Sequence, residues 1–187
     1  MLSPQLRAFL DHDTGAANLL DNVLCEALTN RALQIYYIYS PNEPAAYHYY
    51  TEANGVVVAI REDQHALDEF LCLIYEVLNS EHDVEFQELT RRAEARNISK
   101  VDFAHEVLRG EFKAALRTKL LISKVKFRKK ETSQSYYYKH IAGCPDTFEE
   151  FLTSIEKESK NGRDPIKEYE ANYDSLKLKS GSPVLEK

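Results

Sequence analysis

The 187-residue sequence has only three cysteines, Cys25, Cys72 and Cys144, and no two of them form a C-x-x-C pair. An odd and widely spaced set is typical of a reducing, cytoplasmic compartment rather than of a disulfide framework. The absence of C-x-x-C excludes zinc ribbons and thioredoxin-type redox sites. The sequence also lacks G-x-G-x-x-G, G-K-[ST] and G-x-S-x-G, which removes the easily recognised nucleotide-binding and hydrolase classes.

Long hydrophobic runs are missing as well. Runs such as Val56–Ile60 and Leu71–Ile74 are far too short to cross a membrane, and charged residues interrupt the N-terminal apolar stretch. We therefore expect neither a membrane span nor a secretory signal. With 43% hydrophobic and 29% charged residues, the composition excludes a disordered or fibrous chain.

The pattern of the residues that are present predicts an α+β fold. Residues 33–39 are β-branched and aromatic, and residues 47–51 and 56–60 flank a hairpin signal, Asn54-Gly55. These runs predict a small antiparallel sheet over about residues 33–60. Apolar stripes with a 3.6-residue period then predict a helix-dominated C-terminal two thirds that packs against the sheet, with helices over residues 64–78, 84–96, 99–122 and 148–158.

Turn and capping signals give the boundaries of the domain. Ser3 and Pro4 predict the start of a first helix, and the aromatic run Tyr136–Tyr138 predicts a late strand. We expect one domain over residues 1–160. Glycines and prolines then predict a loosely ordered C-terminal tail over residues 161–187.

Charge is distributed unevenly along the chain, whose formal net charge is −6. Residues 1–112 carry 8 basic and 19 acidic side chains, whereas residues 113–130, the basic segment, carry 8 basic and none acidic. The basic segment has two interpretations: cations at the negative end of a helix dipole, or a contact surface for an anionic partner. Nucleic acid is not expected as that partner, because the acidic remainder of the chain repels it. The candidate contact residues are Lys113, Arg117, Lys124, Lys126, Arg128, Lys129 and Lys130.

Two groups of side chains have spacings that suit catalysis or metal binding. Cys144 lies four residues after His140 and forms with it a candidate thiol–imidazole pair, the alternative being a plain loop cysteine. His65 and Glu69 share one helical face, with Cys72 about 20° away, so these three suggest a metal site. The alternative for them is a solvated helix face. We expect no bound cofactor.

The block from Ala59 to Phe112 runs strand, helix (Leu71–Ser80), helix, and helix (Phe103–Phe112). This order resembles small zincin-like metallopeptidase domains, including degenerate members among bacterial toxin-type proteins. In that family a sheet precedes a helix that carries His-Glu-x-x-His, and a later helix supplies a third, often acidic, metal ligand. The resemblance therefore implies a candidate cleft along the first of these helices.

The motif residues depart from the family pattern. Tyr75 and Asn79 stand where the two histidines would be, and Glu76 stands where the general base would be. Glu106 or Glu111 would supply the third ligand. Tyrosine and asparagine are poor zinc ligands, and without metal Glu76 has no activated water to deprotonate. Glu76 keeps two interpretations: a base recessed in the cleft, or a residue on the solvent side of its helix.

Tyrosine is abundant, with 12 residues that gather mainly at positions 36–39, 47–50 and 136–138. On adjacent strands, alternate tyrosines form an exposed aromatic face, which suits a protein interface or stacking on a nucleic acid or sugar. The alternative is cross-strand packing in which the hydroxyls reach water.

Together these patterns predict a non-catalytic, cytoplasmic protein of degenerate zincin-like architecture that acts through contacts with a protein partner. The first alternative is a metal-dependent hydrolase that uses Glu76 with Glu106 or Glu111. The second alternative is a module that binds an anionic partner through residues 113–130. The sequence predicts no particular oligomeric state.

Overall fold

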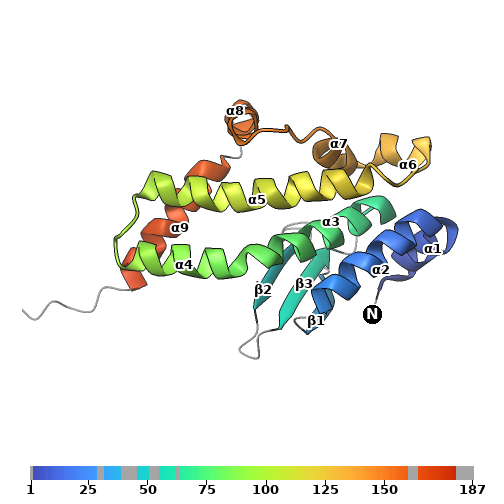
Figure 1. Cartoon of the computed structure of the whole chain (residues 1–187), viewed down its shortest axis with the longest axis horizontal. Helices are drawn as coiled ribbons and strands as arrows, with labels where there is room; N and C mark the ends of the chain where they lie inside the picture. The colour runs from blue at the N-terminus through green and yellow to red at the C-terminus, as the bar shows by residue number, and fades with distance from the viewer. Residues whose placement is uncertain are drawn as a thin grey trace, which may run out of the picture. The chain divides into compact units, whose positions relative to one another are not determined.

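The computed structural model describes residues 2–28, 32–38, 46–50, 55–61, 64–159 and 164–179. A small sheet and a majority of helix make up these residues, so the predicted α+β, helix-dominated fold is confirmed (Figure 1). No helix in the described ranges has both the length and the apolar character needed to cross a bilayer. The elements in chain order are α1 (Pro4–His12), α2 (Thr14–Leu28), β1 (Leu33–Ile38), β2 (Ala46–Tyr50), β3 (Val56–Arg61), α3 (Ala66–Asn79), the 3-10 turn η1 (Ser80–His82), α4 (Asp83–Glu94), α5 (Lys100–Ile122), α6 (Lys129–Gln134), α7 (Tyr136–Ala142), α8 (Phe148–Ser159) and α9 (Pro165–Lys179).

The chain divides into two compact units. Unit 1 comprises Met1–Glu81 and Ala114–Cys144, and unit 2 comprises His82–Lys113 and Pro145–Lys187. This division differs from the expected single domain over residues 1–160, because unit 2 takes in residues on both sides of position 160. The expected loose tail is wrong for α9, a fifteen-residue helix whose Tyr173 is only 3% exposed.

The sheet is built around β3, in the order β1-β3-β2. Residues Val56–Ile60 of β3 are at most 3% exposed, and such a continuous apolar run is typical of a strand buried on both faces. β2 pairs with β3 antiparallel, which confirms the predicted hairpin pairing, although residues 51–54 of its turn lie outside the described residues. β1 pairs with β3 parallel, so the sheet is mixed and not wholly antiparallel. Because β3 occupies the centre, β1 and β2 must each take one edge.

The two faces of the sheet have different environments. Val56, Val58 and Ile60 belong to the main hydrophobic cluster of unit 1, and α3 lies across this face (Figure 1). Since side chains alternate along a strand, Ala59 points to the opposite face. Tyr36 and Tyr47 are both register partners of Ala59, and they are 54% and 37% exposed. The predicted exposed aromatic face is therefore confirmed for Tyr36 and Tyr47.

The first helix and the aromatic run near the end of unit 1 both begin at a serine cap. The Ser3 hydroxyl accepts the Leu6 N–H at 3.0 Å, which confirms the helix start predicted from Ser3 and Pro4. Tyr136–Tyr138 form the first turn of α7, so the predicted late strand is wrong. The Ser135 hydroxyl accepts the Tyr138 N–H at 2.9 Å, and this cap outweighs the β-propensity of tyrosine.

Unit 2 is held by aromatic contacts between its helices. The rings of Phe103 on α5 and Tyr173 on α9 lie 5.6 Å apart, and the Tyr173 hydroxyl donates to the Ile98 carbonyl at 2.8 Å. α5 passes close to Phe86 of α4 at Gly110, where a Cβ would lie 2.6 Å from the ring. The absence of a side chain at Gly110 therefore permits this approach.

Candidate functional site

The polar side chains of α3, among them Glu76, are buried. Asp68, Glu69, Glu76 and Asn79 are between 1% and 9% exposed. The reason is that α3 is central in unit 1, where it contacts α1, α2, α7, β2 and β3 (Figure 1). A helix surrounded in this way buries its polar side as well as its apolar stripe. The expectation that Glu76 lies on the solvent side is therefore wrong.

Glu69 lies at the centre of a ring of hydrogen bonds. It accepts from the Ser3 hydroxyl at 2.8 Å and from the Tyr37 hydroxyl at 2.6 Å. The Ser3 N–H in turn donates to the Tyr37 oxygen at 2.8 Å. Burial, and then the bond to Glu69, raises the pKa of Tyr37 well above its ordinary value, so the phenol retains the proton that it donates. The ring joins the start of α1 to β1 and α3.

Asp68, the preceding residue of α3, repeats this arrangement at a second helix. It accepts from the Ser135 hydroxyl and from the Tyr137 N–H, the latter at 3.0 Å. The Ser135 hydroxyl also caps α7. Two successive carboxylates of α3 are therefore each bonded to the N-cap serine of another helix.

Glu76, the candidate general base, faces the sheet. Its Oε2 lies 2.7 Å from Nδ1 of His48 on β2, and both side chains are 11% exposed. His48 is the register partner of Val58, so it projects from the sheet face that α3 covers. The contact therefore ties the C-terminal half of α3 to the edge strand β2.

Cys72 lies between these carboxylates on α3 and is 3% exposed. Its thiol donates to the Gln64 side-chain oxygen at 3.5 Å. Burial, followed by the nearby charges of Glu76 and Asp68, raises the pKa of the Cys72 thiol well above its usual range. Since the thiolate is the nucleophilic form, Cys72 is an inert, protonated thiol at neutral pH.

The suggested metal site at His65, Glu69 and Cys72 receives other contacts. His65 is the N-cap of α3, and its Nδ1 accepts the Leu67 N–H at 3.3 Å. The Glu69 carboxylate accepts hydrogen bonds from the hydroxyls of Ser3 and Tyr37. Over the described ranges, no three His, Cys, Asp or Glu side chains are placed to hold one metal ion.

The candidate pair of His140 and Cys144 also has separate contacts. The His140 ring lies 4.2 Å from the Tyr136 ring, centroid to centroid. Cys144 is 5% exposed, and its carbonyl accepts from the Lys119 ammonium at 2.6 Å. His140 and Cys144 therefore each contact other residues of unit 1.

The residues of the implied peptidase cleft are divided between the two units. In unit 1, Tyr75 is half-buried, and Asn79 is buried with its side-chain oxygen lacking a partner among the described residues. In unit 2, Glu106 lies 3.5 Å from Arg109, and Glu111 accepts from the Tyr169 hydroxyl. Glu106 also lines a shallow depression of about 680 Å³ together with Arg92, Arg96 and Asp102.

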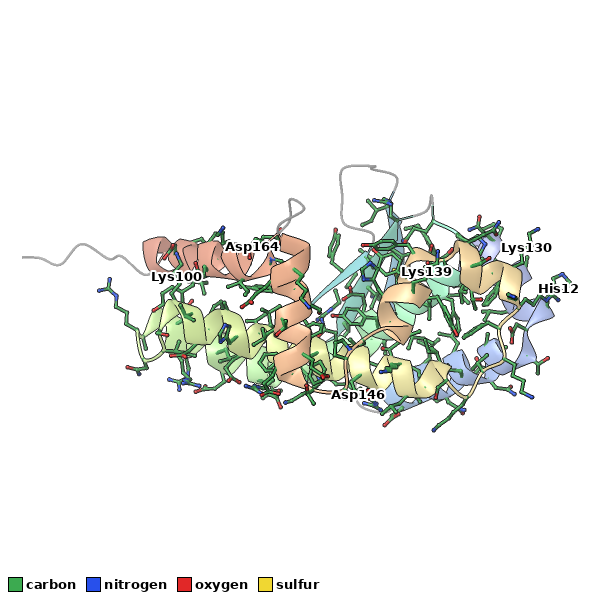
Figure 2. All side chains as sticks on the ribbon, turned by 90° about the horizontal axis from the view of Figure 1, so that it is seen from above. His12, Lys100, Lys130, Lys139, Asp146 and Asp164 are labelled. Carbon is green, nitrogen blue, oxygen red and sulfur yellow. The ribbon has the colours of Figure 1, made fainter. Side chains whose placement is uncertain are left out.

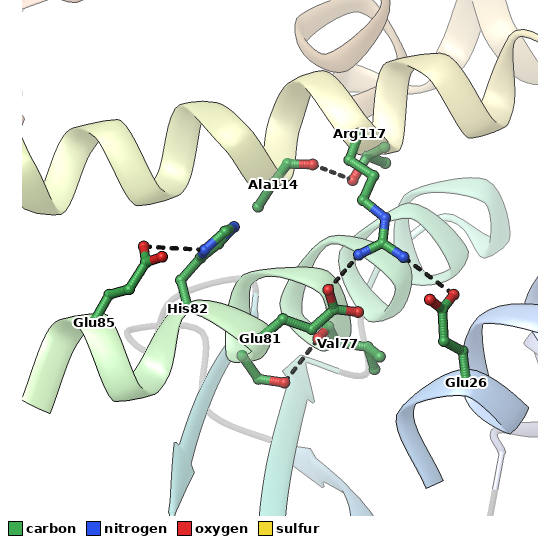
Figure 3. Close-up of polar contacts among 9 residues, drawn as sticks. Glu26, Val77, Glu81, His82, Glu85, Ala114 and Arg117 are labelled. Carbon is green, nitrogen blue, oxygen red and sulfur yellow. Dashed lines mark hydrogen bonds and ion pairs between the residues drawn. The ribbon is translucent and has the colours of Figure 1, made fainter. Parts of the chain in front are cut away.

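The basic segment contains two kinds of residue. Lys113 lies 3.2 Å from Glu85 within unit 2, and the guanidinium of Arg117 bridges Glu81 and Glu26 within unit 1 (Figure 3). These cations serve intramolecular contacts. The other predicted contact residues are all exposed: Lys124, Lys126, Arg128, Lys129 and Lys130.

Sequence reasoning singled out Glu69 and Glu76 on α3 but missed Asp68 and the partners of all three carboxylates. Ser3 was readable as a cap, but its second bond, to Glu69, crosses 66 residues. Ser135 precedes an aromatic run, and its bond to Asp68 crosses 67 residues. Only the excess of acidic residues inside an otherwise apolar helix signals that such partners exist.

Tyr37→Phe tests the ring of hydrogen bonds that joins Ser3, Tyr37 and Glu69. The substitution removes one donor from a buried carboxylate, so we expect the free energy of unfolding to fall by about 1–3 kcal/mol. Tyr36→Phe is the matched control, because Tyr36 is the neighbouring residue and is exposed. Its effect is expected to stay within about 0.5 kcal/mol. Equal effects in urea denaturation would show that the bond to Glu69 adds no stability.

Cys72→Ala tests the protonated thiol through the dependence of stability on pH. The folded state keeps the Cys72 proton above the thiol's ordinary pKa of about 8.5, whereas the unfolded chain releases it. Stability is therefore complete below that pH and falls above it, by about 1.4 kcal/mol per pH unit for this group. We expect Cys72→Ala to reduce the slope between about pH 8.5 and 10, and Cys25→Ala, at an exposed position, to leave it unchanged. Identical slopes would mean that Cys72 ionises freely in the folded state.

The comparisons with known proteins give no family and no relative for this chain. The resemblance to zincin-like domains thus stays a prediction from the order of the elements. Searches against protein-family models, curated proteins and solved structures find no match to this chain.

Proposed function

We propose that this chain is an intracellular, non-catalytic protein of degenerate zincin-like architecture that acts through contacts with another protein. The observation that carries the proposal is that each buried carboxylate on α3 has a hydrogen-bond or ion-pair partner within the fold. Asp68 and Glu69 accept from serine caps, and Glu76 pairs with His48. A general base needs its carboxylate within reach of a substrate proton, whereas these oxygens are engaged with groups of the fold.

The contacts of the other candidate residues give less support to the hydrolase alternative. Glu106 is 45% exposed beside Arg109, and Glu111 is bonded to Tyr169. Each of these carboxylates has a partner within its own unit. The departure of Tyr75 and Asn79 from the zincin-like ligand pattern supports the same proposal.

Two exposed tyrosines on the sheet support contact with a protein. Tyr36 and Tyr47 are both register partners of Ala59 and are 54% and 37% exposed, whereas Ala59 and Val57 of the central strand are at most 3% exposed. The exposed side chains on this side of the sheet, Gln34, Tyr36 and Tyr47, carry no charge. Tyrosine is enriched at protein interfaces because it offers a large apolar surface with a hydroxyl at its end. A neutral, apolar surface on the partner would complement these two tyrosines.

The cysteines support an intracellular location. All three carry thiols, and Cys72 and Cys144 are buried in unit 1. A chain with this odd, widely spaced set suits a reducing compartment.

The proposal is tested by an activity arm and a contact arm. In the first, the full chain is supplied in turn with Zn²⁺, Mn²⁺ and Mg²⁺ and assayed on fluorogenic peptides and esters beside Glu76→Gln. We expect no turnover that depends on Glu76. In the second, a photoreactive phenylalanine analogue replaces Tyr36 or Tyr47 in cells, with Val84, which is 74% exposed on α4, as the control position.

The contact arm is expected to give a discrete protein adduct from positions 36 and 47 and none from position 84. Turnover by the wild type above the Glu76→Gln background would contradict the non-catalytic part of the proposal. Adducts that are absent from positions 36 and 47, or equal at position 84, would contradict the contact surface.

A further inference from the structure

Five cations lie between the end of α5 and the first turn of α6 in unit 1. They are Lys124, Lys126, Arg128, Lys129 and Lys130, and all are exposed; Lys130 is labelled in Figure 2. Within the part of the chain that the structure describes, none of them forms an ion pair. The nearest acid in sequence, Glu131, has one carboxylate oxygen buried. We call Lys124–Lys130 the cationic turn.

Apolar residues fix the cationic turn to the core of unit 1. The Phe127 ring packs edge-on against Phe70 at 5.9 Å and against Tyr138 at 5.8 Å, and Phe70 is fully buried. Val125 packs against the start of α2, with its Cγ1 3.3 Å from where a Cβ of Gly15 would lie. The chain thus alternates between inward apolar residues and outward cations, so the cations project from an anchored backbone.

Helix electrostatics do not account for these charges. α5 ends at Ile122, and the basic residue of its last turn is Lys119. The cationic turn lies beyond that end, and Arg128, Lys129 and Lys130 occupy the N-cap and the first two positions of α6. Cations are unfavourable at the positive end of a helix, and like charges repel. Charges that are unfavourable for the stability of their own segment are expected at sites that bind a partner.

We propose that the cationic turn docks an acidic, extended segment of another protein; this deepens the proposed function by naming the chemistry of a partner. Lys126 and Arg128 lie in the non-helical stretch between the two helices, and Lys129 and Lys130 open α6, so the cations gather along one short piece of chain. Charge complementarity between this positive surface and an acidic segment steers their association.

The surroundings favour an acidic peptide over a nucleic acid. Single strands bind through bases stacked on aromatic rings, and the ring of the cationic turn, Phe127, is directed into the core. A long polyphosphate would also run over a chain whose net charge is −6. A short acidic segment meets only the cations.

The test is fluorescence anisotropy with the full chain. The probe is a fluorescein-labelled peptide of alternating Glu and Ser, compared with the same peptide carrying Gln for Glu and with an oligothymidylate of equal charge. The binding variant is Lys126→Gln/Arg128→Gln. The matched control is Lys113→Gln/Lys167→Gln, which changes the net charge equally at exposed cations outside the turn.

We expect the acidic peptide to bind, the Gln peptide not to bind, and Kd to rise at least about tenfold in the binding variant but less than about twofold in the control. Lys129→Gln/Lys130→Gln should weaken binding while keeping or raising the thermal midpoint, which separates lost charge from lost folding. No binding, equal losses in both double variants, or tighter binding of the oligothymidylate would overturn the proposal. Adducts from Tyr36 and Tyr47 and the absence of Glu76-dependent turnover do not depend on this turn, so either proposal can fail alone.

Discussion

Unit 1 depends on one repeated interaction, a serine that caps one helix while donating its hydroxyl proton to a buried carboxylate of α3. Ser3 caps α1 and donates to Glu69, and Ser135 caps α7 and donates to Asp68. Each serine therefore satisfies an orphan N–H at a helix start and one acceptor of a buried charge. If either partner is lost, a buried polar group is left without its bond, so the helix ends are fixed in position against α3.

Because of this arrangement, Asp68, Glu69, Cys72 and Glu76 on the polar side of α3 all have partners within the fold. Glu76 is drawn to the sheet by His48, and Cys72 keeps its proton among the carboxylates. Residues whose spacing suggests catalysis thus stabilise the core. Features that point to function then lie on surfaces: the neutral row of Tyr36 and Tyr47, and the cationic turn, where charge is unfavourable for local stability.

Local signals in the sequence predicted the local structure. The cap at Ser3 was readable, and the helix predicted over residues 99–122 is α5, where the Ser99 hydroxyl accepts the Asp102 N–H at 3.1 Å. The strand at Val56–Ile60 followed from its composition, but its central place and the parallel partner β1 depend on long-range pairing. The burial of Glu76 was missed because periodicity places it away from the apolar stripe without saying what covers that side. The bonds from Ser3 to Glu69 and from Ser135 to Asp68 join residues more than 60 positions apart, and no local pattern encodes them.

A double-mutant cycle between Ser3→Ala and Glu69→Ala tests whether serine caps and buried carboxylates form one unit. We expect a coupling energy of about 1–3 kcal/mol in the free energy of unfolding, because Ser3→Ala removes a donor to the buried carboxylate and Glu69→Ala removes the acceptor of the buried hydroxyl. The exposed pair Ser99→Ala and Asp102→Ala provides the comparison, since its side chains also bond, at 2.6 Å, but in contact with water. A coupling at Ser3 and Glu69 as small as that of the exposed pair would show that the serine caps and the buried carboxylates are independent.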